Sequence, residues 1–234
     1  MLADGATATL RAEEALMLHR RLEDPLGTAH SQLMLASSVA GDDMVRAQQL
    51  YDESARAFRR LGDEHNVLIA NRGLAYAYMS LGERERGRAL HEDNLVHART
   101  LSNERIEAIT LGALAMFAVE DGRLEDAVSM LKESHRLHRD VGDPLQSAFD
   151  VLRFAHLLAA QGRAETATRV FASADALCEE IGSSLRSWDP EFIDETLAMI
   201  HARLDDAAFA EAWEAGRVLT ADEAVALALE EPDG

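Results

Sequence analysis

The sequence predicts an all-α protein, an α-α superhelix of tandem antiparallel helix pairs closed by a C-terminal helical cap. Three observations support this fold class. Ala, Leu, Glu and Arg are abundant and aromatic residues make up only 5% of the 234-residue chain, which favours helix over strand. The prolines, at positions 25, 144, 190 and 232, stand where helix boundaries are expected. Turn residues recur with a period of about 40 residues.

Two interleaved series of turn residues define the period. The first is Gly41, Gly82, Gly122 and Gly162, and the second is Gly62, Ser102, Gly142 and Gly182. Within each series the spacing is 40 or 41 residues, so that a turn falls about every 20 residues. Glycine ends a helix easily because it adopts positive φ without a Cβ clash. Turns at this interval between helical patterns indicate antiparallel helix pairs.

Apolar positions repeat with the same period. The first helix of a pair carries Leu-Ala or Phe-Ala, ending at Ala75, Ala115 and Ala155. The second helix carries a small residue and, one turn later, a large one: Ala47, Gly87, Ala127 and Ala167 are followed by Tyr51, His91, Leu131 and Phe171. Small residues where helices cross let the backbones approach, and the large residue fills the adjacent groove.

These patterns predict helices throughout the repeat region, residues 1–182, in which the first pair is incomplete. Their expected bounds are 8–22, 26–40, 43–61, 64–81, 84–101, 104–121, 124–141, 144–161 and 164–181. The dipeptide Asp143-Pro144 is typical of a helix start, with a capping side chain followed by a proline in the first turn.

Residues 183–234 break the repeat and are predicted to form C-terminal capping helices. A loop at 183–189 leads into a helix from Pro190 to about Leu204, and a short helix covers 207–215. Thr220 and Glu223 have the spacing of a capping box and open a last helix, to about Glu230. A cap of this kind covers the last apolar face of a repeat array.

The N-terminal helix reads like the second helix of a pair whose first helix is missing. One face carries Leu10, Ala15, Leu18 and Leu22. Two explanations remain open. The helix simply packs on the first pair, or this face is an interface, used for dimerisation or covered by a preceding part of a longer protein.

Residues 112–127, GALAMFAVEDGRLEDA, resemble the tetratricopeptide repeat family. The matching features are the Leu-Ala pair of the first helix, Gly122 before the second, and the small residue Ala127 five positions later. The usual period of the family is about 34 residues, so a period of 40 implies longer helices. The aromatic residue that often opens the motif is absent.

The C-terminal tail narrows the resemblance. Residues 207–231, AAFAEAWEAGRVLTADEAVALALEE, look like the C-terminus of large bacterial transcriptional regulators, and residues 169–182 are similar to their last repeat. In these LuxR-type and SARP-type regulators a DNA-binding domain and an ATPase of the STAND class precede a tetratricopeptide region. The resemblance implies a sensor or interaction arm; no Walker-type loop or DNA-reading helix accompanies it.

Charge and composition exclude several functions. The formal net charge of −19 disfavours direct binding to nucleic acid or an anionic membrane. The single cysteine, Cys178, fits a reducing compartment, and no stretch has the roughly 20 apolar residues of a membrane helix. The N-terminus lacks a signal-peptide pattern. We therefore expect a cytoplasmic protein.

No catalytic constellation or cofactor site is expected. His135 and His138 lie three residues apart, but a zinc site needs further ligands, and His138 falls at the repeat position of Phe58 and Cys178. His138 is therefore interpreted as a packing residue, and Cys178 as a small hydrophobe. The sequence predicts that the chain is not an enzyme and holds no metal.

The first helices of stacked pairs line the concave side of such arrays, and the residues facing that side are the predicted binding face. They are Leu35, Arg72, Tyr76, Met79, Met116, Val119, Leu152, Arg153 and His156. One interpretation is a groove for an apolar peptide or helix, in which Tyr and Met make adaptable contacts. The other is that this stripe packs against the chain itself or a neighbouring subunit.

Three functions remain at this point. The leading one is a non-catalytic module that binds a protein or peptide, as a sensor or interaction arm of a bacterial transcriptional regulator. The second is a receptor for a small molecule or signal peptide in the concave groove. The third is a scaffold that forms a homodimer through its N-terminal face.

Overall fold

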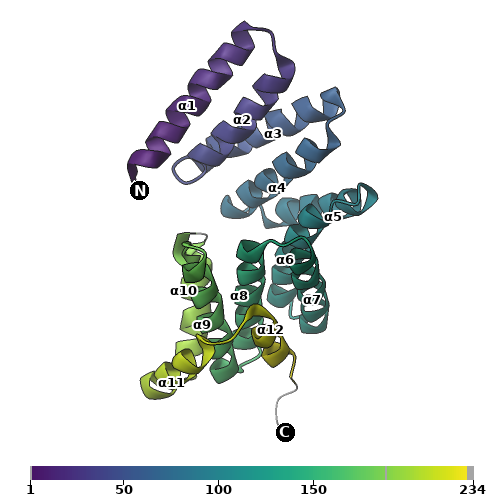
Figure 1. The fold of residues 1–234 in the computed structure, drawn as a ribbon. Helices are drawn as coiled ribbons and strands as arrows, with labels where there is room; N and C mark the ends of the chain where they lie inside the picture. The colour runs from purple at the N-terminus through teal and green to yellow at the C-terminus, as the bar shows by residue number, and fades with distance from the viewer. Residues whose placement is uncertain (1, 188, 231–234) are drawn as a thin grey trace. The chain divides into compact units, whose positions relative to one another are not determined.

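The computed structural model describes residues 2–187 and 189–230 (Figure 1). Within them the chain forms α-helices and one short 3-10 turn, with no strand. The predicted all-α fold of tandem helix pairs is confirmed. No helix in the described part of the chain has both the length and the apolarity to cross a membrane.

The helices begin and end close to the predicted positions. They are α1 (Leu2–Arg21), α2 (Pro25–Val39), α3 (Met44–Leu61), α4 (Glu64–Ser80), α5 (Arg84–Thr100), α6 (Glu104–Glu120), α7 (Leu124–Asp140), α8 (Pro144–Ala160), α9 (Ala164–Glu180), α10 (Pro190–His201), α11 (Asp206–Gly216) and α12 (Ala221–Leu229), with the 3-10 turn at Leu185–Ser187. The main difference is α1, which begins six residues before the predicted start at residue 8.

Side-chain caps and left-handed turns set the helix ends. Asp43, Asp63 and Asp143 each accept a hydrogen bond from the backbone N–H three residues later. Gly62, Gly82, Gly122, Gly142, Gly162 and Gly182 all have positive φ, and Ser102 adopts φ 52° in the equivalent turn. Gly41 is the exception among the predicted turn glycines, because it is not in the left-handed region.

The chain divides into two compact units, residues 1–110 and 111–234, with the boundary inside α6. In the first unit α1 packs on α2, α2 on α3, α3 on α4 and α4 on α5. The small residues lie where the helices cross: Ala47 is fully buried, and a Cβ on Gly73 would lie 2.3 Å from the ring of Tyr51. These crossings are the close approaches that the repeat pattern indicates.

In the second unit the tail helices cover α8 and α9. Both α10 and α12 pack against α8 and α9, and α11 packs against α9. As a result every residue of α8 from Ser147 to Ala159 is buried, although only one face of an outer repeat helix is normally covered. The capping box at Thr220 and Glu223 is present. The division of the chain at residue 182 into repeats and cap stays a prediction.

Gly216, at the end of α11, lies directly on the backbone of α9. A Cβ on Gly216 would come within 2.1 Å of the Arg169 carbonyl oxygen, which cannot move without shifting α9. We expect Gly216→Ala to lower the free energy of unfolding by about 2–3 kcal/mol through overpacking. Gly41→Ala is the matched control, because a Cβ there meets no atom within 4 Å. Urea denaturation measures both variants, and equal midpoints would contradict this account of α11 packing.

Candidate functional site

In the first unit the predicted binding face is partly open. The Tyr76 side chain on α4 is 45% exposed, whereas Leu35 on α2 is buried in the core. Arg72 on α4 is half-buried and forms no hydrogen bond or ion pair with another described residue; burial lowers the pKa of its guanidinium. Met79 is half-buried and lies over Gly87 of α5, where a Cβ would approach Met79 Cγ to 2.8 Å. Tyr76 and Arg72 are therefore the members of the predicted face on α4 that remain accessible to solvent.

In the second unit the same face is covered. Leu152, Arg153 and His156 on α8 are buried. Val119 on α6 is also buried, and Met116 is half-buried against the core of this unit. Contact with a partner at the α8 positions would require the chain's own helices to move aside. Partner binding along the whole predicted face stays a prediction.

Helix α10 provides the cover over His156. The His156 ring stacks on Phe192 with ring centroids 4.5 Å apart, and its Nδ1 lies 2.9 Å from the Thr196 hydroxyl. Burial lowers the pKa of His156 to about 4, so the imidazole is neutral at physiological pH. The capping helix thus occupies the place that the sequence assigned to a binding partner.

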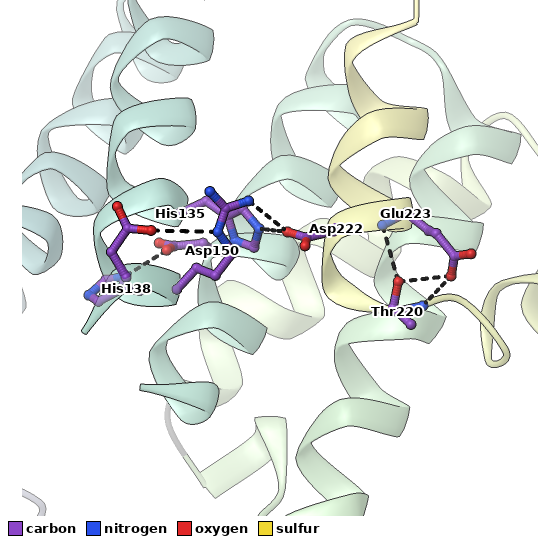
Figure 2. A network of polar contacts seen from close by, with 8 residues as sticks. His135, His138, Asp150, Thr220, Asp222 and Glu223 are labelled. Carbon is purple, nitrogen blue, oxygen red and sulfur yellow. Dashed lines mark hydrogen bonds and ion pairs between the residues drawn. The ribbon is translucent and has the colours of Figure 1, made fainter. Parts of the chain in front are cut away.

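A buried polar cluster lies between α7 and α8, and we call its members Ser134, His138, Asp150 and Arg153 the Asp150 cluster. Asp150 is fully buried and is the acceptor for the others. Its Oδ1 accepts hydrogen bonds from Ser134 Oγ at 2.8 Å and from Arg153 Nη1 at 2.9 Å. Its Oδ2 lies 2.6 Å from His138 Nδ1 (Figure 2). Several bonds to one carboxylate offset the loss of its hydration.

Gly112 on α6 makes room for the charged member of this cluster. A Cβ at that position would lie 2.8 Å from Arg153 Nη1. Burial lowers the pKa of Arg153, and the adjacent Asp150 carboxylate opposes that shift. The cluster is therefore an ion pair enclosed by packed helices, with a small residue that shapes its space.

The Asp150 cluster contains Ser, His and Asp but lacks the geometry of a nucleophilic triad. In a triad the imidazole stands between the serine and the carboxylate and takes the hydroxyl proton. Here Ser134 donates to the carboxylate itself, and Ser134, His138 and Asp150 are all fully buried. In this structure the Ser134 hydroxyl is therefore bonded to the carboxylate and closed to solvent.

A second polar contact joins α7 to the tail helix α12. His135 Nε2 lies 3.0 Å from Asp222 Oδ1, and Arg139 Nη1 lies 3.5 Å from the same oxygen. The hydrogen bond from His135 lowers the pKa of Asp222. Asp222 falls within the Thr220–Glu223 capping box, so the same turn that starts α12 also positions this carboxylate (Figure 2).

The structure also describes the residues considered from the sequence for metal binding and thiol chemistry. Among the described residues no group of three or more His, Cys, Asp or Glu side chains is placed to hold a metal ion. Cys178 is buried, and burial raises the pKa of its thiol to about 11. A thiol of that pKa is a poor nucleophile at neutral pH.

The predicted N-terminal interface points to solvent. Leu10, Leu18 and Leu22 are 60%, 51% and 74% exposed, and Ala15 is half-buried. The face of α1 that packs on the first unit carries Ala12 and Leu16 instead. Met17, which is 55% exposed beside Leu18, was not among the predicted interface residues.

Asp150 was also not predicted as a functional or buried residue. The available signal was its place in PLQSAFDVLRFAHLLAA, where Asp150 and Arg153, three residues apart, are the only acidic and basic residues apart from His156. Opposite charges at this spacing share a helix face, and such a pair within an apolar helix indicates a buried ion pair.

Comparison with known proteins supports the fold. No family model matches the chain, and no curated protein matches it. Among solved structures it is similar to BtubC (BKLC) from P. vanneervenii, with a TM-score of 0.64 and 17% sequence identity over 98% of this chain and 94% of that one. At this identity the likeness shows the helical-repeat fold.

The Asp150 cluster generates a stability prediction. Asp150→Asn keeps the shape of the side chain but leaves Arg153 buried without its counter-ion, so we expect the free energy of unfolding to fall by about 3–5 kcal/mol. Asp140→Asn removes an exposed partner of Arg136 and should cost no more than about 1 kcal/mol. Chemical denaturation compares the two variants. If Asp150→Asn lowered the free energy of unfolding as little as Asp140→Asn, the cluster would not stabilise the second unit.

His156 generates a pH prediction. The unfolded chain binds a proton at this histidine near pH 6.5 and the folded chain only near pH 4, so its contribution is complete above pH 6.5 and falls as the pH drops towards 4. The shift corresponds to about 3 kcal/mol. We expect His156→Gln to flatten the stability profile between pH 6.5 and 4, measured by urea denaturation. A profile parallel to that of the unchanged chain would refute the lowered pKa of His156.

Proposed function

We propose that this chain is a non-catalytic helical-repeat module that binds another protein or a peptide. The observation that carries the proposal is the open part of the predicted binding face on α4. There Tyr76 is 45% exposed, beside the half-buried Arg72 that forms no ion pair with a described residue. Aromatic and arginine side chains supply a large share of binding energy at protein interfaces.

The chemistry of this surface favours a ligand with both an apolar group and a hydrogen-bond acceptor. A tyrosine ring offers contact area at a small cost in side-chain entropy. A guanidinium that is partly desolvated gains more from an incoming carboxylate or carbonyl oxygen than a fully hydrated one. Because the surface belongs to a packed helix and not to a loop, it is presented without an ordering step.

The finer role is that of an interaction arm in a bacterial transcriptional regulator. Its support is the resemblance of residues 207–231 to the tails of such regulators, together with a helical-repeat fold that is typical of interaction modules. In that setting the tail helices close the repeat region, which leaves the first unit as the part that meets a partner.

Affinity purification with mass spectrometry from the native host tests the proposal. Tyr76→Ala should abolish or strongly reduce recovery of the specific partner, because it removes the main exposed contact of α4 without touching the core. Val96→Ala is the matched control, since Val96 is 68% exposed on α5, which does not belong to the predicted face. Circular dichroism verifies the folding of both baits.

The comparison between the two baits decides the outcome. A protein retained by the Val96 variant and lost with the Tyr76 variant supports binding through α4. The same set of proteins with both baits and with the unchanged chain removes this surface from consideration.

A further inference from the structure

We infer that the outer face of α1 pairs with the same face of a second copy of this chain, in antiparallel orientation about a two-fold axis near Met17 and Leu18. The inference is independent of partner binding through Tyr76. It rests on the order of exposed side chains along α1 and on the hollow beside them.

The exposed residues Leu10, Glu14, Met17, Leu18 and Arg21 form a single ridge, which we call the α1 ridge. With 3.6 residues per turn they fall within about 100° of one another around the helix. They lie opposite Ala12 and Leu16, through which α1 packs on its own unit. Met17 and Leu18 are both more than half exposed at the centre of the ridge.

When two copies of the ridge run in opposite directions, the acidic residue of one copy faces the basic residue of the other. Along the chain the ridge reads apolar, acidic, apolar, basic, and the exposed Leu22 follows it. If a second copy runs in the opposite direction, Met17 and Leu18 meet their equivalents, Glu14 faces the partner's Arg21, and Leu10 lies towards the end that carries Leu22. Each of these contacts occurs twice because a two-fold axis makes the interface self-complementary.

A parallel arrangement lacks this match. It would set Glu14 against Glu14 and Arg21 against Arg21, which are like charges. The antiparallel arrangement also opposes the two helix dipoles. Charge order therefore selects one orientation.

Existing contacts leave the charged residues of the ridge available. Glu14 approaches Arg11 at 3.4 Å, but both side chains are well exposed, and such a pair contributes little. Arg21 forms no ion pair with another described residue. Exchange of the weak intramolecular pair for Glu14–Arg21 pairs across the axis therefore costs little.

The hollow beside the ridge gives the partner's side chains a place to pack. It has a volume of about 370 Å³; Leu16, Met17 and Leu35 form the apolar part of its lining, and Glu13 and three arginines form the rest. A long apolar side chain from the second copy can enter it as a knob enters a hole between packed helices. The ridge is the length of one helix, so we expect a weak dimer with a Kd in the range of about 10–100 µM.

Sedimentation velocity of the whole 234-residue chain tests the inference, in a concentration series from about 1 µM to about 300 µM. Glu14→Arg and Arg21→Glu each place like charges at both ends of the axis. Each should raise the Kd by about tenfold or more. The double variant Glu14→Arg with Arg21→Glu restores opposite charges and should return the Kd to within about threefold of the unchanged chain. Glu92→Arg, an exposed change of the same charge on α5 of the same unit, should leave it unaltered.

Each outcome either supports or overturns the antiparallel dimer. Loss with both single variants and recovery in the double variant establishes the antiparallel pairing. A chain that stays monomeric over the whole range overturns the inference, and so does a dimer whose Kd ignores the single variants or remains weak in the double variant. Partner capture by α4 is measured separately and is unaffected by either result.

Discussion

A helix in this chain has one apolar stripe, and the requirement that each stripe be covered determines the rest of the structure. Neighbouring helices such as α2, α3 and α4 meet this requirement by packing on one another, with small residues such as Ala47 and Gly73 where they approach closely. Turns with left-handed glycines reverse the chain within a few residues. An array of this kind always ends on a helix whose outer face has no successor, so its ends need a separate solution.

The C-terminal end solves the problem with its own tail. Helices α10, α11 and α12 lie on α8 and α9, and α8 becomes buried on all sides. A helix enclosed in this way must also satisfy its polar groups, which explains why Asp150, Arg153 and His156 all have partners inside the protein. The cap and the buried polar groups are thus two parts of one arrangement.

The sequence predicted the local features well, because each depends on residues close together in the chain. The bounds of α3 to α9 follow from turn residues at a fixed interval, Asp143 marks the start of α8, and the Thr220–Glu223 box marks α12. Contacts between distant residues were harder to predict. Nothing near His156 shows that Thr196 and Phe192, forty and thirty-six residues later, return to cover it.

The difference between local features and contacts of distant residues also explains the candidate site. The period places Tyr76 and His156 at equivalent positions, yet one is exposed and the other is enclosed, because helix α10 lies over His156. Periodicity thus predicts which face of a helix a residue occupies, while the presence of another element over that face is a property of the whole fold. The spacing of Asp150 and Arg153 within an apolar helix indicates an ion pair, but the bonds of Asp150 to His138 and Ser134 come from another helix and depend on the fold.

The N-terminal end differs from the C-terminal end in what covers it. Within the described residues no helix lies over the ridge of α1, and large apolar side chains there remain in contact with water. A net charge of −19 opposes the approach of a second identical chain at most of its surface. Self-association therefore needs a place where acidic and basic residues balance and face each other. The sequence of α1, with Glu14 and Arg21 on either side of Met17 and Leu18, provides such a place, because the general repulsion is replaced locally by attraction and apolar contact.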